Sequence, residues 1–259
     1  MSDMKLKVQS GGQSDTGLKR QHNEDRILAS DVLGLYAVAD GMGGHAAGEV
    51  ASEAAIKALE EFVARTRDDP DFTWPFGRHE EYDLEENILH SAVALANRQV
   101  CRLSEKNAAL GGMGTTLAAL YMPEDKAYIC HVGDSRVYLL REGGLQGLTV
   151  DHSWVNEQVQ RNLISQEEAR QHRWRNVITR ALGSREDVEI DLTRIEPQPG
   201  DLFLICSDGL TSMVDDATIT QCLASANGDL AGACAELVKK ANAAGGLDNV
   251  SVVLVSVEG

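Results

Sequence analysis

Two apolar stretches of this chain each end in the dipeptide Asp-Gly, and this repeated design constrains the fold more than any other feature. Residues 35–48 read LYAVADGMGGHAAG and pass from an apolar run through Asp40 into a glycine-rich loop and a helix-forming run. Residues 201–209 read DLFLICSDG and again end a strand-like run in Asp-Gly. One such pair is an ordinary turn. Two of them predict strands that deliver carboxylates to loops.

Length and composition predict one soluble domain. The chain has 259 residues, 43% of them hydrophobic, which is enough for one large core. No linker or repeat divides residues 1–259, so a single catalytic domain is expected. The N-terminus is polar, and no apolar run approaches the roughly 20 residues of a membrane span. We therefore expect a cytoplasmic monomer without a membrane partner.

The charge balance argues against nucleic acid as a partner. The net charge is −16, with 40 Asp and Glu against 24 Lys and Arg, and such a surface repels phosphate backbones. Most of these acids are interpreted as solvated surface, and some as a carboxylate cluster that divalent cations neutralise. The 5 cysteines form no C-x-x-C pair and are interpreted as free thiols in a reducing compartment.

The order of the predicted elements indicates an α+β sandwich, in which antiparallel sheets lie face to face and helices cover the outside. Strands are expected at 5–17, 26–29, 35–39, 117–121, 126–132, 136–141, 145–148, 188–195, 201–206 and 250–257. Helices are expected at 45–66, 84–106, 216–224 and 229–243. A polar, mainly helical segment follows Asp151. Residues 67–86 are interpreted as a surface connection whose Trp74 and Phe76 pack on the helix pair or anchor a partner.

Acidic residues recur at the predicted strand ends and turns, namely at Glu24/Asp25, Asp40, Asp208 and Asp248. Each of them alone is typical of a cap or a turn. Together they are better explained as one site, because uncompensated carboxylates at converging strand ends repel one another. Hard oxygen ligands suit Mg²⁺ or Mn²⁺, which keep several waters and need few protein ligands.

Seven short motifs occur in order along the chain and carry a family resemblance. They are RQHNED at 20–25, DGMGG at 40–44, GMGTT at 112–116, GDSR at 133–136, DH at 151–152, SDGL at 207–210 and DN at 248–249. Over essentially its whole length the chain resembles the bacterial form of the metal-dependent serine/threonine protein phosphatases of type 2C. The resemblance implies two packed antiparallel sheets flanked by pairs of helices in four layers, with a mobile flap near residues 152–180.

The resemblance also assigns metal ligands for two ions of Mn²⁺ or Mg²⁺ and a weaker third. Asp40 would bridge two ions, and Asp208 and Asp248 would complete the protein ligands of the first. The carbonyl of Gly41 would bind the second ion. The remaining ligands implied are Glu24 and Asp25, which reach the second ion directly or through water, and Asp151, which with Asp208 binds the third.

The implied chemistry is hydrolysis of a phosphate ester. A hydroxide bridging two ions roughly 3.5–4 Å apart would attack phosphorus in line. Arg20 would hold the phosphate, since a guanidinium can bind two oxygens at once; the alternative for Arg20 is an ion pair with Glu24 or Asp25. Eukaryotic relatives carry a His, the proposed general acid, where this chain has Met42. Here His45 or a metal-bound water would protonate the leaving group, unless His45 is a cap or surface residue.

Three further expectations concern residues around the site. Asp134 and Arg136 are expected to pair within their hairpin, and Asn249 is expected to orient Asp248. The flap carries five arginines against three glutamates. We expect these arginines to position an acidic phosphopeptide or, alternatively, to form a solvated helical face.

The leading functional hypothesis is a phosphatase of phosphoserine and phosphothreonine in proteins, acting against a bacterial serine/threonine kinase. Its partners would be phosphorylated proteins and a cognate kinase. The alternatives are a metal-dependent phosphoesterase of small molecules and a pseudophosphatase that serves as a binding module. The presence of Asp40, Asp208 and Asp248 speaks against the pseudophosphatase.

Overall fold

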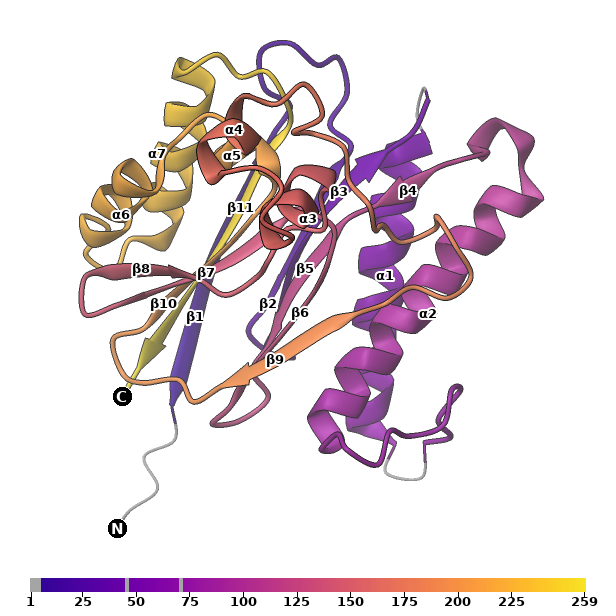
Figure 1. Cartoon of the computed structure of the whole chain (residues 1–259). Helices are drawn as coiled ribbons and strands as arrows, with labels where there is room; N and C mark the ends of the chain where they lie inside the picture. The colour runs from indigo at the N-terminus through magenta and orange to yellow at the C-terminus, as the bar shows by residue number, and fades with distance from the viewer. Residues whose placement is uncertain (1–5, 45–46, 70–71) are drawn as a thin grey trace.

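Two antiparallel sheets pack face to face in the computed structural model, which describes residues 6–44, 47–69 and 72–259 (Figure 1). The first sheet has the strand order β1 (Lys7–Asp15), β11 (Val250–Glu258), β10 (Leu202–Cys206), β7 (Arg136–Arg141), β8 (Gly144–Gly147). The second has the order β2 (Asp25–Ser30), β3 (Leu35–Met42), β5 (Leu117–Tyr121), β6 (Ala127–Val132), β9 (Asp191–Ile195), and the short β4 (Gly114–Thr115) pairs with β3. The expected α+β sandwich is confirmed.

Pairs of helices cover the two outer faces (Figure 1). The long helices α1 (Ala47–Asp68) and α2 (Leu84–Lys106) bury their apolar faces on the second sheet. Helices α6 (Asp216–Ala224) and α7 (Leu230–Ala243) do the same on the first sheet. The shorter elements are η1 (Ala108–Leu110), α3 (Trp154–Gln160), α4 (Gln166–Gln171) and α5 (Asp208–Thr211). No helix within the described ranges is long and apolar enough to cross a membrane.

Strand β3 shows why the sandwich forms from this sequence. Successive side chains of a strand point to opposite faces of its sheet. Leu35, Ala37 and Ala39 pack against the helix pair α1/α2, whereas Tyr36 and Val38 pack between the two sheets. Because both faces are covered, the strand is an uninterrupted apolar run, and all of these side chains are fully buried.

The element boundaries follow the sequence closely, with two informative differences. Strand β3 continues past its predicted end, because Gly41 pairs with Thr115 and Met42 pairs with Gly114. The mainly helical segment expected after Asp151 consists of two short helices, and each follows a serine whose side chain caps it. In the 67–86 connection, Trp74 packs against the core under α1 and α2, as one of the two interpretations expected.

Candidate active site

Two carboxylates lie directly opposite each other where β2 and β3 pair, because Asp25 is the register partner of Asp40. Like charges in this relation destabilise a sheet. Asp25 is 1% exposed, and burial together with Asp208 raises the pKa of its carboxyl to about 7. Burial and the neighbouring Asp25 likewise raise the pKa of Asp40 well above its ordinary value. This edge of the sheet therefore favours a bound cation.

The threonines of the GMGTT motif fix the backbone of Asp40. Thr116 Oγ1 accepts a hydrogen bond from Asp40 N at 3.0 Å, and Thr116 N donates to Asp40 O at 2.9 Å. Thr115 Oγ1 also donates to Asp40 O at 2.9 Å. This role of the two threonines was not predicted, although their place in a motif was.

Asp208 and Asp248 come from the neighbouring strands β10 and β11. Asp208 begins α5 two residues after the end of β10, and Asp248 lies two residues before the start of β11. A Cβ on Gly209 would lie 1.9 Å from the carbonyl oxygen of Asn249, so only glycine lets the start of α5 pack this closely on β11. Burial, followed by the charge of Asp248, raises the pKa of Asp208 to about 6.

Gly41, Gly48 and Glu24 form a tightly packed junction beside Asp40. A Cβ on Gly41 would lie 2.0 Å from Gly48 O and 2.6 Å from Glu24 O. A Cβ on Gly48 would lie 2.6 Å from Glu24 Oε1. Burial raises the pKa of Glu24, and the buried Glu24 Oε1 has no hydrogen-bond partner among the described residues. The glycines of the DGMGG loop thus bring Glu24 against the Gly41 backbone.

Asp134 also belongs to this carboxylate cluster, and its membership was not predicted from the sequence. Its pKa is raised to about 7 by burial and then by the charges of Asp208 and Asp151. The expected pair between Asp134 and Arg136 is wrong. Arg136 instead binds both oxygens of Asp151, at 2.8 and 2.7 Å. The signal available in the sequence was a further Asp at a turn before a strand.

Arg20 lies at the mouth of the cluster with its side chain 49% exposed, and its Nη2 is 2.7 Å from Asp248 Oδ2. Its partner is therefore Asp248, not Glu24 or Asp25. The hydrogen bond to Asp248 is the main cause that raises the pKa of Arg20. The predicted His45 lies outside the described residues.

The donor set fits the implied ions. It consists of carboxylate oxygens that repel one another, and the buried Asp25 Oδ1 has no hydrogen-bond partner in the described part of the chain. Such hard, anionic oxygens suit Mg²⁺ and Mn²⁺. A bound divalent cation would neutralise the repulsion that raises these pKa values.

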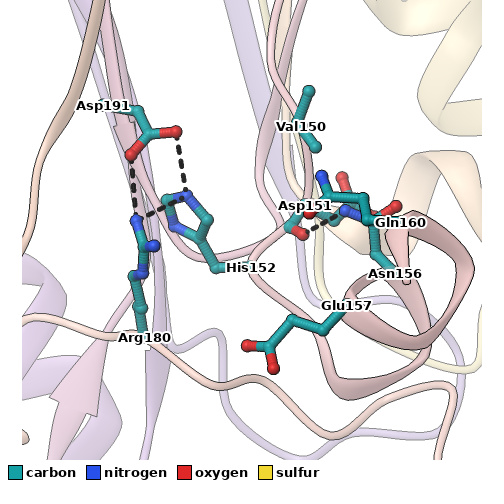
Figure 2. Close-up of a pocket in the computed structure, with 8 residues that line it drawn as sticks. All are labelled: Val150, Asp151, His152, Asn156, Glu157, Gln160, Arg180 and Asp191. Atoms are coloured by element: carbon teal, nitrogen blue, oxygen red, sulfur yellow. Dashed lines mark hydrogen bonds and ion pairs between the residues drawn. The ribbon is translucent and has the colours of Figure 1, made fainter.

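A second polar group lies at the base of the flap, beside a cavity of about 210 Å³ (Figure 2). It comprises His131, His152 and Asp191, whose ligand atoms lie within 4.8 Å of one another. His152 Nδ1 accepts a hydrogen bond from Gly133 N, so the proton of the neutral ring is on Nε2, which faces Asp191 at 3.3 Å. Arg180 Nη1 also binds Asp191, at 2.9 Å. A protonated nitrogen beside a guanidinium does not suit a cation, so this group braces the flap.

The fold and the acidic cluster together define an enzyme class. Carboxylates from both sheets meet at an oxygen-only centre of the kind that holds divalent cations for hydrolysis. Residues 18–240 match the family model described as Protein phosphatase 2C. The chain belongs to the protein phosphatase 2C family, as the motifs predicted.

Named relatives agree with this membership. The chain is 38% identical to the serine/threonine phosphatase stp of Listeria innocua over 93% of both chains. It is 41% identical to the serine/threonine protein phosphatase PstP of Mycobacterium tuberculosis over 99% of this chain, which corresponds to 46% of PstP.

Solved structures agree as well. The crystal structure of M. tuberculosis PstP/Ppp superposes with a TM-score of 0.84 at 40% identity, covering 97% of this chain and 99% of the other. The catalytic domain of PstP in complex with 2 manganese ions gives a TM-score of 0.83 at 38% identity, covering 98% of this chain and all of the other.

Proposed function

We propose that this chain hydrolyses phosphoserine and phosphothreonine in proteins, with Mn²⁺ or Mg²⁺ held by the acidic cluster. The observation that carries the proposal is the convergence of Asp25, Asp40 and Asp208 from separate elements. Each of these carboxyls has its pKa raised by burial and by neighbouring carboxylates. Clustered buried carboxyls with raised pKa values are typical of functional sites.

The ligands divide among the ions as follows. Asp40, Asp208 and Asp248 would hold the first ion, and Asp40 with the Gly41 carbonyl would hold the second, which Glu24 and Asp25 would reach directly or through water. Asp134 is a stronger candidate than Asp151 for the third ion, because Asp151 would first have to release Arg136. When bound, the ions supply an activated water and neutralise charge during in-line displacement at phosphorus.

Arg20 supplies the phosphate contact. Its guanidinium is exposed at the mouth of the cluster and lies beside Asp248, so it can bind phosphate oxygens next to the ions. By fixing the phosphate there, Arg20 orients the ester for displacement and stabilises charge on the phosphoryl oxygens. The thioether of Met42 has no proton to give to the leaving serine oxygen. We assign that step to His45 or to a water of the site.

The physiological setting is also proposed. The substrates are phosphorylated serine/threonine proteins, and a cognate kinase supplies them. With a net charge of −16 the chain does not bind nucleic acid. It acts as a cytoplasmic monomer without a membrane partner, and residues 1–259 form one catalytic domain.

The test is phosphopeptide hydrolysis with Mn²⁺, with EDTA and with the variant Asp208→Asn. EDTA should abolish turnover. Asp208→Asn should lower kcat about a hundredfold or more, since metal ions contribute several kcal/mol to such reactions. Asp215→Asn is the matched control, because it removes one charge but keeps the cap of α6. Activity that survives EDTA or Asp208→Asn contradicts the proposal, and faster turnover of nucleotides than of phosphopeptides contradicts the substrate class.

A further inference from the structure

The loop between β1 and β2, residues 16–24, carries Arg20 and Glu24 but contains only turns and bends. Its backbone contacts the turn after α7, where Leu18 N and Lys19 N both donate to Gly246 O. At its end, Glu24 O accepts from Gly41 N and Ser52 Oγ. A loop of this kind is held in place chiefly by side chains that pair with its backbone groups.

Asn249 supplies that pairing. Its side chain is buried, with the residue 4% exposed. The Nδ2 amide donates to Thr16 O and to His22 O, both at 2.9 Å. The Oδ1 oxygen accepts from Glu24 N at 2.8 Å. Both amide protons and the amide oxygen are thus used on three backbone groups spread across the loop.

The backbone of Asn249 ties the same residue to the acidic cluster. Asn249 N donates to Asp248 Oδ1 at 2.8 Å, so the expected orientation of Asp248 comes from the main chain and not from the side chain. The start of α5 also packs on the Asn249 carbonyl, which lies 1.9 Å from where a Cβ on Gly209 would be. One residue therefore joins the Arg20 loop to Asp208 and Asp248.

We propose that Asn249 is a positioning residue, whose carboxamide clamps residues 16–24 and so holds Arg20 where it meets the phosphate of the substrate. The inference rests on the proposed function, which assigns Arg20 to phosphate. Only a carboxamide offers two donors and an acceptor in this space. A serine is too short to reach the three backbone groups, and an aspartate has no N–H to give to Thr16 O and His22 O.

Asn97 offers a matched control elsewhere in the molecule. It is 1% exposed, its Nδ2 donates to Arg185 O and Glu186 O at 2.9 and 2.7 Å, and its Oδ1 accepts from Gly183 N at 2.8 Å. The pattern is the same as at Asn249, but the clamped loop carries none of the proposed site residues. Asn97→Ala therefore reports the general cost of losing such a clamp.

The first measurement is amide hydrogen exchange, which needs no activity. Asn249→Ala should raise exchange in residues 16–24, and Asn97→Ala should raise it in residues 183–186. Protection of residues 16–24 that matches the wild type in Asn249→Ala overturns the clamp. If Asn249→Ala does not fold, Asn249→Ser serves in its place with the same expectation.

The second measurement is a double-mutant cycle with Arg20→Ala on phosphopeptide kcat/KM. Asn249→Ala should lower kcat/KM by roughly 10- to 100-fold, as for other residues that orient a ligand-binding group. In the Arg20→Ala background the loss should fall to about threefold or less, because both changes act on one contact. An undiminished loss in that background overturns the role through Arg20. A wild type without phosphatase activity refutes the proposed function instead and leaves the exchange result interpretable.

Discussion

At the scale of single residues, the site depends on positions where no side chain fits. Gly41 is the clearest case, since its φ is not in the left-handed region and the limit is space alone. For Gly44, three residues on, no atom of the described residues beyond its chain neighbours lies within 4 Å of an added Cβ. Close packing therefore requires glycine at position 41, whereas the space at position 44 does not require it.

Gly41→Ala should destabilise the protein and weaken metal binding, because the new Cβ would lie 2.0 Å from Gly48 O. Overpacking of this kind costs about 1–3 kcal/mol. Gly44→Ala should change the free energy of unfolding by about 0.5 kcal/mol or less. Urea unfolding and Mn²⁺ titration of both variants check this. If the two variants have equal free energies of unfolding and equal Mn²⁺ affinities, the backbone around Gly41 moves to accept a Cβ, which contradicts the prediction.

Most residues of the cluster were predictable from motifs, but the place of Asp134 in it and the partners of the two arginines were not. Arg136 has an Asp two positions before it and another fifteen positions after it. Proximity in sequence favoured Asp134 as the partner of Arg136. In the fold, the guanidinium of Arg136 instead makes two parallel hydrogen bonds with the carboxylate of Asp151 across the hairpin. The same limit applies to Arg20, whose partner Asp248 is 228 positions away.

At the scale of elements, periodicity and capping placed the helices and strands well. Helix α2 begins at the predicted residue because Asp83 and Glu86 form a capping box. The extension of β3 and the strand β4 could not be predicted, because each exists only through pairing with the other. Two short helices in the flap depend on serine caps that resemble ordinary polar loop residues.

The flap has a braced base and an exposed tip. Ser153 and Ile178 form a β-bridge, and Thr179 N donates to His152 O at 2.8 Å. Toward the tip, the guanidinium of Arg173 lies 4.6 Å from the ring centre of Trp174, and both residues are exposed. Arg173 and Arg175 make no ion pair within the described ranges, so they are available to an acidic peptide.

Reversing both arginines, Arg173→Glu with Arg175→Glu, should raise KM for acidic phosphopeptides roughly two- to twentyfold with little change in kcat. Exposed ion pairs contribute up to about 1 kcal/mol each, and salt screens them. Steady-state kinetics at low and at physiological ionic strength check this. The control reverses two charges on α7 with Lys239→Glu and Lys240→Glu, whose lysines form ion pairs with Glu236. A KM that stays at the wild-type value contradicts a role of the flap in peptide binding.

At the scale of the whole molecule, the acidic cluster links stability to pH and metal. In the metal-free protein the pKa values of Asp25 and Asp208 are raised to about 7 and about 6, against an ordinary 3.8. Between about pH 4 and 7 the folded state therefore binds more protons than the unfolded state. The contribution of these carboxyls to stability therefore falls as pH rises through that window, whereas His90 and His152, whose pKa values are lowered by burial, act in the opposite direction.

We expect the Tm in EDTA to be higher near pH 5 than near pH 8. Mn²⁺ should raise the Tm strongly at pH 8 and weakly at pH 5, because protons compete with the ion for the carboxylates. Thermal unfolding with and without Mn²⁺ checks both statements. The decrease of the Tm in EDTA between pH 5 and pH 8 should be smaller in Asp208→Asn, because this variant lacks one of the titrating groups. A Tm in EDTA that rises over this interval contradicts the account.

The pairing of β1 with β11 also determines when, during synthesis of the chain, the proposed site can be assembled. Strand β11 lies between β1 and β10, and Asp248 lies two residues before its start. A ribosome adding about 5–20 residues per second makes Asp248 roughly 10–50 seconds after Arg20, which lies 228 positions earlier. Until then the proposed site lacks one of the carboxylates that would hold an ion. The proposed metal site therefore cannot be complete before Asp248 has been made, so a nascent chain that has not reached this residue would lack one of the proposed ligands.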